Sequence, residues 1–382
     1  IKYYSELIDN YPKSSYLVKA KLQKGLLYFN MKEDEKALEC LKNVVAEYPG
    51  TPESKEALMT IQDIYIYMNK VDEFLVYVKD FKGVSNTEED SMTYQAIELR
   101  YMKGDCNNSR TSFENYIKTF PEGIFIINAH FYKAECDYKA AALDEALQGY
   151  DYVISKPRNK FTESALLKAS SICYSKKDYN TALQYYIKLE QIAEYDANII
   201  EAKKGIMRCY FELQSYDKAI EAAEKLLNTP KVNEDQLLCD EANLIIGRSA
   251  YLLNNIAKAQ AIFVILSKQS KGEAKAEAKY YLAEIQYKLK NYDESEKEIF
   301  ELINQVPSYD KWIAKGFILL ADNYYITGNP FEAKQTLKAI IDNYKGTDLV
   351  EIAYAKLNAI IEAEKSTNQQ LEETNPENIQ QE

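Results

Sequence analysis

Apolar residues recur along this chain three and four residues apart, in segments that come in pairs separated by short polar turns. In one such pair, Leu282 and Ile285 precede the turn KNYDES, and Ile299 and Leu302 follow it. Turns of the same kind read MKEDEKA, KKDYNTA, LQSYDKA and ITGNPFEA. This spacing is typical of amphipathic helices, so each pair of segments predicts a helical hairpin.

The hairpins repeat at a fixed period. A residue that is small in all hairpins but the second follows each polar turn, every 35 to 40 residues, at Ala37, Phe74, Ser109, Ala146, Ala182, Ala219, Ala259, Ser295 and Ala333. The prolines agree with this division, because a helix interior excludes proline at about 3 kcal/mol. Six fall just past a second helix, at Pro12, Pro49, Pro121, Pro157, Pro230 and Pro307, and Pro52, Pro330 and Pro376 lie in turns or the tail. A period of this size indicates a repeat solenoid.

A second small position lies twelve residues before most of these sites, at Gly25, Ala134, Ser170, Gly247, Ala283 and Ala321. With aromatics three residues beyond this position, as in KGLLYFNMKEDEKALECLKNVVAEYP, the chain resembles the tetratricopeptide repeat family over about residues 1–366. The resemblance implies an all-α, right-handed superhelical solenoid of about nine helical hairpins. Its period is near 37 residues instead of 34, and the second repeat has Gln62 and Phe74 where small residues belong.

The ends and one joint depart from the repeat. DLVEIAYAKLNAIIEAEKS predicts a lone capping helix, and residues 367–382, which lack apolar periodicity, are expected to be a disordered tail. The longest polar connection, 81–90, predicts a bend or weak joint. IKYYSELIDNYP predicts a second helix without its first, so we expect the natural protein to extend upstream, where an export signal or lipid anchor would lie.

Composition narrows the class of function. A net charge of -12 argues against nucleic acid and anionic lipid as partners, and no stretch approaches the roughly 20 apolar residues of a membrane span. The single histidine, His130, is expected to be an ordinary helix residue, and phosphate-binding and hydrolase motifs are absent from the sequence. We therefore expect no enzyme, metal or cofactor, and a protein or peptide as the partner.

The six cysteines contain no C-x-x-C pair. Cys136, Cys173 and Cys209 recur on successive first helices, whose axes are expected about 8–10 Å apart, too far for disulfides. The sequence therefore favours small buried hydrophobic residues over bridges. Unpaired cysteines slightly favour a reducing compartment, but the cysteines do not decide the compartment.

One equivalent position carries an aromatic residue in eight repeats and Ile66 in the other. The resemblance implies that this position lines a concave groove that binds peptides, and Tyr offers a large contact area with few rotors. The alternative is packing between neighbouring hairpins. Arg208 and Arg248 precede two of the aromatics by three residues and could fork a partner's acidic group, or pair with glutamates such as Glu212 and Glu241. The candidate partner-binding residues are Phe29, Tyr101, Tyr138, Tyr174, Arg208, Phe211, Arg248, Tyr251, Tyr287 and Tyr325.

The sequence is compatible with two functions. The junctions YPKS and YPGT look like those of bacterial envelope members of the family, such as the outer-membrane assembly lipoprotein BamD and the C-terminal domain of the Tol-Pal accessory protein. This similarity implies a non-catalytic scaffold in the periplasm, associated with the outer membrane and acting in envelope assembly or maintenance. The alternative is a cytoplasmic regulator that binds a signalling peptide or regulatory protein.

Overall fold

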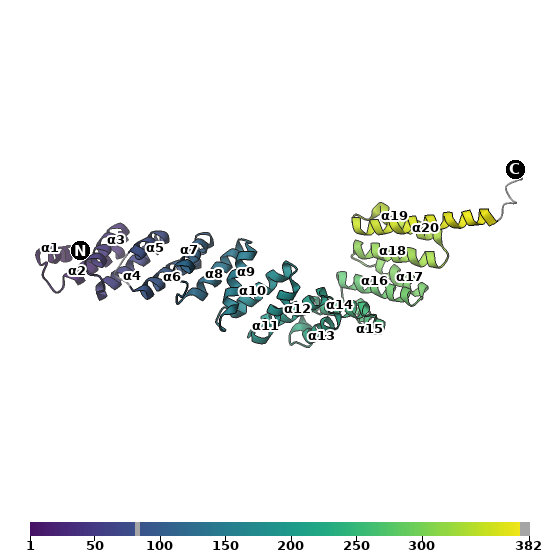
Figure 1. The fold of residues 1–382 in the computed structure, drawn as a ribbon, viewed down its shortest axis with the longest axis horizontal. Helices are drawn as coiled ribbons and strands as arrows, with labels where there is room; N and C mark the ends of the chain where they lie inside the picture. The colour runs from purple at the N-terminus through teal and green to yellow at the C-terminus, as the bar shows by residue number, and fades with distance from the viewer. Residues whose placement is uncertain (81–84, 375–382) are drawn as a thin grey trace. The chain divides into compact units, whose positions relative to one another are not determined.

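The computed structural model describes residues 1–80 and 85–374, with side chains up to Lys79 and from Ser85 to Thr367. These residues form twenty α-helices and one short 3-10 segment (Figure 1). The chain divides into two compact units, residues 1–172 and 173–382.

The first unit contains α1 to α9 and most of α10. Their bounds are α1 (Lys2–Asn10), α2 (Leu17–Asn30), α3 (Asp34–Glu47), α4 (Pro52–Tyr67), α5 (Val71–Asp80), α6 (Asn86–Met102), α7 (Cys106–Thr119), α8 (Ile126–Lys139), α9 (Leu143–Ser155) and α10 (Thr162–Ser175). Pro52 does not lie in a turn as expected but begins α4, where a proline needs no hydrogen-bond donor.

The second unit starts within α10 and runs through α20. Its helices are α11 (Tyr179–Ile192), α12 (Asp196–Glu212), α13 (Tyr216–Leu227), η1 (Val232–Glu234), α14 (Gln236–Leu252), α15 (Ile256–Gln269), α16 (Gly272–Lys288), α17 (Tyr292–Ile303), α18 (Asp310–Ile326), α19 (Pro330–Asn343) and α20 (Thr347–Thr374). Consecutive pairs from α2–α3 to α18–α19 are the nine expected hairpins, and α20 is the expected cap. Pro330 begins α19.

Small residues set the spacing within each hairpin. The eight Ala and Ser residues that follow the polar turns are completely buried. On the facing first helices, a Cβ added to Gly25 would lie 2.7 Å from a methyl carbon of Leu41, and one added to Gly247 would lie 2.8 Å from the Phe263 ring. In the second hairpin the large Phe74 is completely buried instead, with its ring 6.2 Å from that of Tyr65. A small residue at these sites therefore lets a large side chain of the partner helix reach the backbone.

The nine hairpin turns share one backbone conformation. Each contains a residue in the left-handed region, three positions after the aromatic site, at Lys32, Asn69, Gly104, Ala141, Lys177, Gln214, Asn254, Lys290 and Gly328. Only Gly104 and Gly328 are glycines, for which positive φ carries no steric penalty. A side chain at the other seven positions is tolerated because the two helices hold the turn.

Successive first helices also contact each other. In the second unit α12 contacts α14, α14 contacts α16, α16 contacts α18, and α18 contacts the cap α20. We call the surface that these helices and α10 build within residues 173–374 the first-helix face. It is the surface on which the sequence places the aromatic position.

Two expected segment boundaries differ in the structure. Residues 86–90 belong to α6, because Ser85 caps this helix and forms a reciprocal capping box with Glu88. The rest of the expected bend, residues 81–84, lies outside the described residues. The tail was expected to begin at 367, but α20 continues to Thr374, since this segment lacks proline and glycine and includes helix-favouring Gln, Leu and Glu. Residues 375–382 lie outside the described part.

Candidate binding surface on the first helices

The aromatic positions are mostly half-buried. Seven of the eight rings are partly covered, Tyr325 is 45% exposed, and Ile66 is buried. Three rings meet a tyrosine that opens the second helix of the same hairpin. Tyr174–Tyr179, Phe211–Tyr216 and Tyr287–Tyr292 lie edge to face, with centroids 5.3, 5.8 and 5.7 Å apart. A second aromatic five residues later was the signal in the sequence for this packing.

In the first unit the candidate rings also pack within the chain. Phe29 is partly buried and packs against the core of the first hairpins. Tyr101 lies 4.7 Å from Tyr132 and 6.2 Å from Phe113, between ring centroids. The ammonium of Lys168 lies 4.4 Å from the centroid of Tyr138. These contacts support the packing alternative for the first unit, and a binding role for these residues stays a prediction.

The two arginines are already engaged within the chain. Arg208 forks the Glu241 carboxylate, with Nη2 donating to Oε2 at 2.7 Å, and Arg248 forks Glu277, which is only 3% exposed. The pairing with Glu241 confirms one expected alternative. Each arginine joins one first helix to the next, so it positions the face on which a partner would lie.

Four candidate residues nevertheless line one cavity on the first-helix face. This cavity has a volume of about 420 Å³, and we call it the groove pocket. The four candidates that line it are Tyr174, Arg208, Phe211 and Arg248. Its other lining residues are Glu212, Leu237, Asp240, Glu241, Leu244, Ile245, Lys271, Gly272, Glu273 and Ala274. Leu237 at its rim is 82% exposed. The pocket thus combines an apolar wall with ion-paired edges.

Tyr251 and Tyr287 lie further along the same face. The ammonium of Lys288 lies 3.8 Å from the centroid of Tyr251, whose hydroxyl is covered. Burial and the nearby Glu284 carboxylate raise the pKa of Tyr251 above its usual range. Tyr287 lines a second cavity of about 340 Å³ between α16, α18 and α20.

The single histidine is packed within the chain. His130 stacks on Tyr152 with ring centroids 3.6 Å apart, and burial together with Lys133 and Lys156 lowers its pKa to about 4. It is therefore neutral at pH 7 and packed, as expected. Within residues 1–80 and 85–374, no cluster of three or more His, Cys, Asp or Glu could hold a metal ion. The described helices include none that is both long enough and apolar enough to cross a bilayer.

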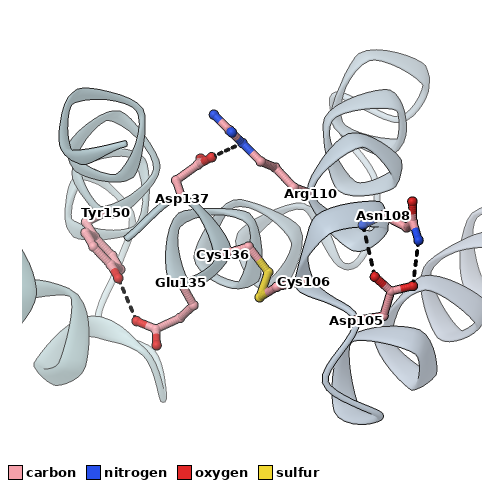
Figure 2. Close-up of a disulfide and its surroundings, with 8 residues drawn as sticks. All are labelled: Asp105, Cys106, Asn108, Arg110, Glu135, Cys136, Asp137 and Tyr150. Atoms are coloured by element: carbon pink, nitrogen blue, oxygen red, sulfur yellow. Dashed lines mark hydrogen bonds and ion pairs between the residues drawn. A yellow bond between two sulfur atoms is a disulfide. The ribbon is translucent and has the colours of Figure 1, made fainter. Parts of the chain in front are cut away.

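The cysteine prediction was wrong for one pair. Cys106 and Cys136 form a disulfide, with Cα atoms 5.2 Å apart (Figure 2). The sequence argument compared first helices with each other, whereas this bridge joins the second helix α7 to the following first helix α8, which packs directly on it. Beside it, Arg110 pairs with Asp137, and the Tyr150 hydroxyl donates to Glu135 Oε1 at 2.6 Å.

Comparison with known families identifies the repeat in two segments of the chain. Residues 19–51, which contain α2 and α3 almost entirely, and residues 244–308, which run from α14 to α17, each match a model described as tetratricopeptide repeat. These two segments are tetratricopeptide repeats. Tetratricopeptide proteins are generally non-catalytic scaffolds that bind protein or peptide partners.

Solved structures with the same repeat are similar over long stretches but share little sequence. A tetratricopeptide repeat protein from Parabacteroides merdae is 16% identical, with 71% of this chain and 98% of that chain covered and a TM-score of 0.40. The C-terminal part of a repeat protein from Cytophaga hutchinsonii is 15% identical, with 68% and 98% covered and a TM-score of 0.48. YrrB, described as having an unusual peptide-binding site, is 18% identical, with 55% and 100% covered and a TM-score of 0.39. No curated protein matches the chain.

Proposed function

We propose that the chain is a scaffold that holds a polypeptide partner against the first-helix face, with the groove pocket as the main contact. The observation that carries this proposal is the convergence of Tyr174 and Phe211 with exposed Leu237 on one 420 Å³ cavity. Cavities of this size with apolar walls and a few polar groups are typical binding sites. Aromatic anchors in such a cavity supply much of the energy of a protein interface.

A photo-crosslinking residue at Leu237 tests this function in the natural host. We expect it to capture a defined polypeptide, and we expect Phe211→Ala to reduce the yield severalfold because the ring forms part of the pocket wall. The matched control places the same crosslinker at Ile265, which is exposed on the second helix α15. Equal capture from both positions, or capture that survives Phe211→Ala, would contradict the proposal.

We further propose that the protein works in the bacterial periplasm, in assembly or maintenance of the envelope. Two observations support this placement: the resemblance of the YPKS and YPGT junctions to envelope members of the family, and the Cys106–Cys136 disulfide. Disulfides persist in oxidising compartments and are rare in the cytosol. The disulfide removes the slight preference for a reducing compartment that unpaired cysteines suggested.

The compartment is tested by alkylating the thiols of intact cells before lysis and fractionation. A periplasmic protein is expected in the osmotic-shock or membrane fraction with Cys106 and Cys136 protected from the reagent. Recovery from the cytosol with both thiols alkylated would instead favour the regulator. The partner captured at Leu237 provides an independent check, because its own compartment is measured in the same fractionation.

A further inference from the structure

The second cavity on the first-helix face differs from the groove pocket in its charge. This cavity, which we call the C-terminal pocket, has a volume of about 340 Å³. It is lined by Tyr280, Glu284, Tyr287 and Lys288 of α16, by Lys315, Ile318, Leu319 and Asp322 of α18, and by Leu349, Ile352 and Lys356 of α20.

Ion pairs follow a register along the first-helix face. The residue three positions before the aromatic position of one repeat pairs with the residue ten positions before the aromatic position of the next repeat. The two pairs are Arg208–Glu241 and Arg248–Glu277. The next step would join Glu284 to Lys315. Among the residues that the structure describes, however, Lys315 makes no ion pair, and its ammonium lies 4.6 Å from the Trp312 ring and 5.3 Å from the Tyr280 ring.

The pocket is consequently short of negative charge. Asp322 is neutralised by Lys356, whose ammonium lies 2.7 Å from Oδ1. Lys288 sits over the Tyr251 ring and, within the described part of the chain, makes no ion pair. Two ammonium groups, on Lys288 and Lys315, therefore share one carboxylate, Glu284. Burial and the neighbouring Lys311 lower the pKa of Lys315, and the Glu277 and Glu284 carboxylates offset this lowering only in part.

The floor of the same pocket is apolar. Ile318, Leu319 and Leu349 are buried there, and Ile352 at the rim is 44% exposed. A large apolar side chain that covered this floor would exclude water from the two ammonium groups. An anion beside them would then be bound more strongly than in water, because charge-assisted hydrogen bonds strengthen when desolvated.

We propose that the C-terminal pocket binds a polypeptide segment that lays one large apolar side chain on this floor and places an Asp or Glu carboxylate beside Lys288 and Lys315. The inference rests on the proposed function in that both require a polypeptide partner. It adds a chemical preference that the groove pocket, whose arginines are paired within the chain, does not impose. The excess of positive charge and the apolar floor are complementary to a segment that carries an acidic residue next to an apolar one. A basic segment would be repelled by the two ammonium groups.

The test is a selection from random dodecapeptides displayed with both ends blocked, using the full chain as bait. We expect enrichment of Asp or Glu next to a large apolar residue. A selected peptide, resynthesised with blocked ends, should bind the Lys315→Gln variant about tenfold more weakly than the unchanged protein.

The Glu284→Gln variant lacks the competing carboxylate and should bind the same peptide more tightly than the unchanged protein, a gain that misfolding cannot mimic. Lys338→Gln, an equal charge change on the exposed surface of α19, is the matched control and should bind unchanged.

The inference would be overturned if the selected peptides lacked an acidic residue. It would also be overturned if acidic peptides bound Lys315→Gln and Lys338→Gln with the same affinity. Enrichment only in a parallel library with free C-termini would also overturn it, since the ligand would then be a terminal carboxylate. The crosslink at Leu237 separates this outcome from failure of the proposed function. If Leu237 captures a partner normally from Lys315→Gln and no acidic preference is found, only the second inference fails.

Discussion

Tyr251 and Tyr325 occupy equivalent positions in their repeats, but their surroundings differ. Tyr251 packs edge to face on Tyr281 with centroids 5.3 Å apart and lies under Lys288, whereas Tyr325 is 45% exposed. We expect Tyr251→Ala to lower the free energy of unfolding by about 2 kcal/mol and Tyr325→Ala by less than about 0.5 kcal/mol. Urea denaturation measures both. Equal losses would mean that the position has one role in every repeat.

His130 provides a second test at the residue scale, because it is the only histidine and its NMR signals are unambiguous. We expect the folded protein to titrate it near pKa 4, against about 6.5 in the unfolded chain. The folded state thus binds this proton less readily, so stability is lost as the pH falls from about 6.5 towards 4. His130→Phe keeps the stack on Tyr152 and should lose less stability over that interval. An NMR pKa near 6.5 would contradict the burial.

At the scale of single elements, the hairpin turns are the part that sequence patterns described least well. The polar turns were located correctly from MKEDEKA and its equivalents. Their shared left-handed residue was not, because Lys, Gln, Asn and Ala occupy it more often than Gly. The helices on either side impose this conformation. The backbone preference of the residue type at the turn therefore says little about which residue adopts positive φ.

This leads to a paired prediction on the turns. Ala141 has φ of 58° with no side-chain hydrogen bond to support it, whereas Asn254, with φ of 59°, belongs to a residue type that tolerates this region. We expect Ala141→Gly to stabilise the protein by about 0.5 kcal/mol, the relief of strain being partly offset by greater freedom of the unfolded chain. Asn254→Gly should be neutral or slightly destabilising. Thermal melts of the two variants provide the comparison, and destabilisation by Ala141→Gly would refute the strain.

At the scale of the whole molecule, each hairpin within a unit touches mainly its neighbours, so a local change should remain local. The Cys106–Cys136 bridge closes a loop with a sequence separation of 30, for which chain entropy predicts about 3.6 kcal/mol of stabilisation. We expect reduction to accelerate hydrogen exchange in α7 and α8 and to leave α14 to α18 unchanged. Mass spectrometry with and without reductant measures this.

The control for that experiment is a thiol count in denaturant without reductant. Four reactive thiols are expected, since the sequence has six cysteines and two are bridged. Six thiols would show that the bridge is absent. Faster exchange throughout both units would instead show that the array unfolds as one cooperative whole.

The sequence by itself determined the helices, their pairing into nine hairpins, the cap and the surface that carries the aromatic position. These follow from local chemistry: apolar spacing, prolines after second helices, and small residues such as Ala146 and Gly247 where two helices meet. Only the tertiary structure decided which residues about thirty positions apart touch across neighbouring hairpins. It placed Arg208 on Glu241, bridged Cys106 to Cys136, and left Lys315 without an ion pair among the described residues. Such contacts depend on the rotation of one helix against the next, which no periodicity within a single repeat encodes.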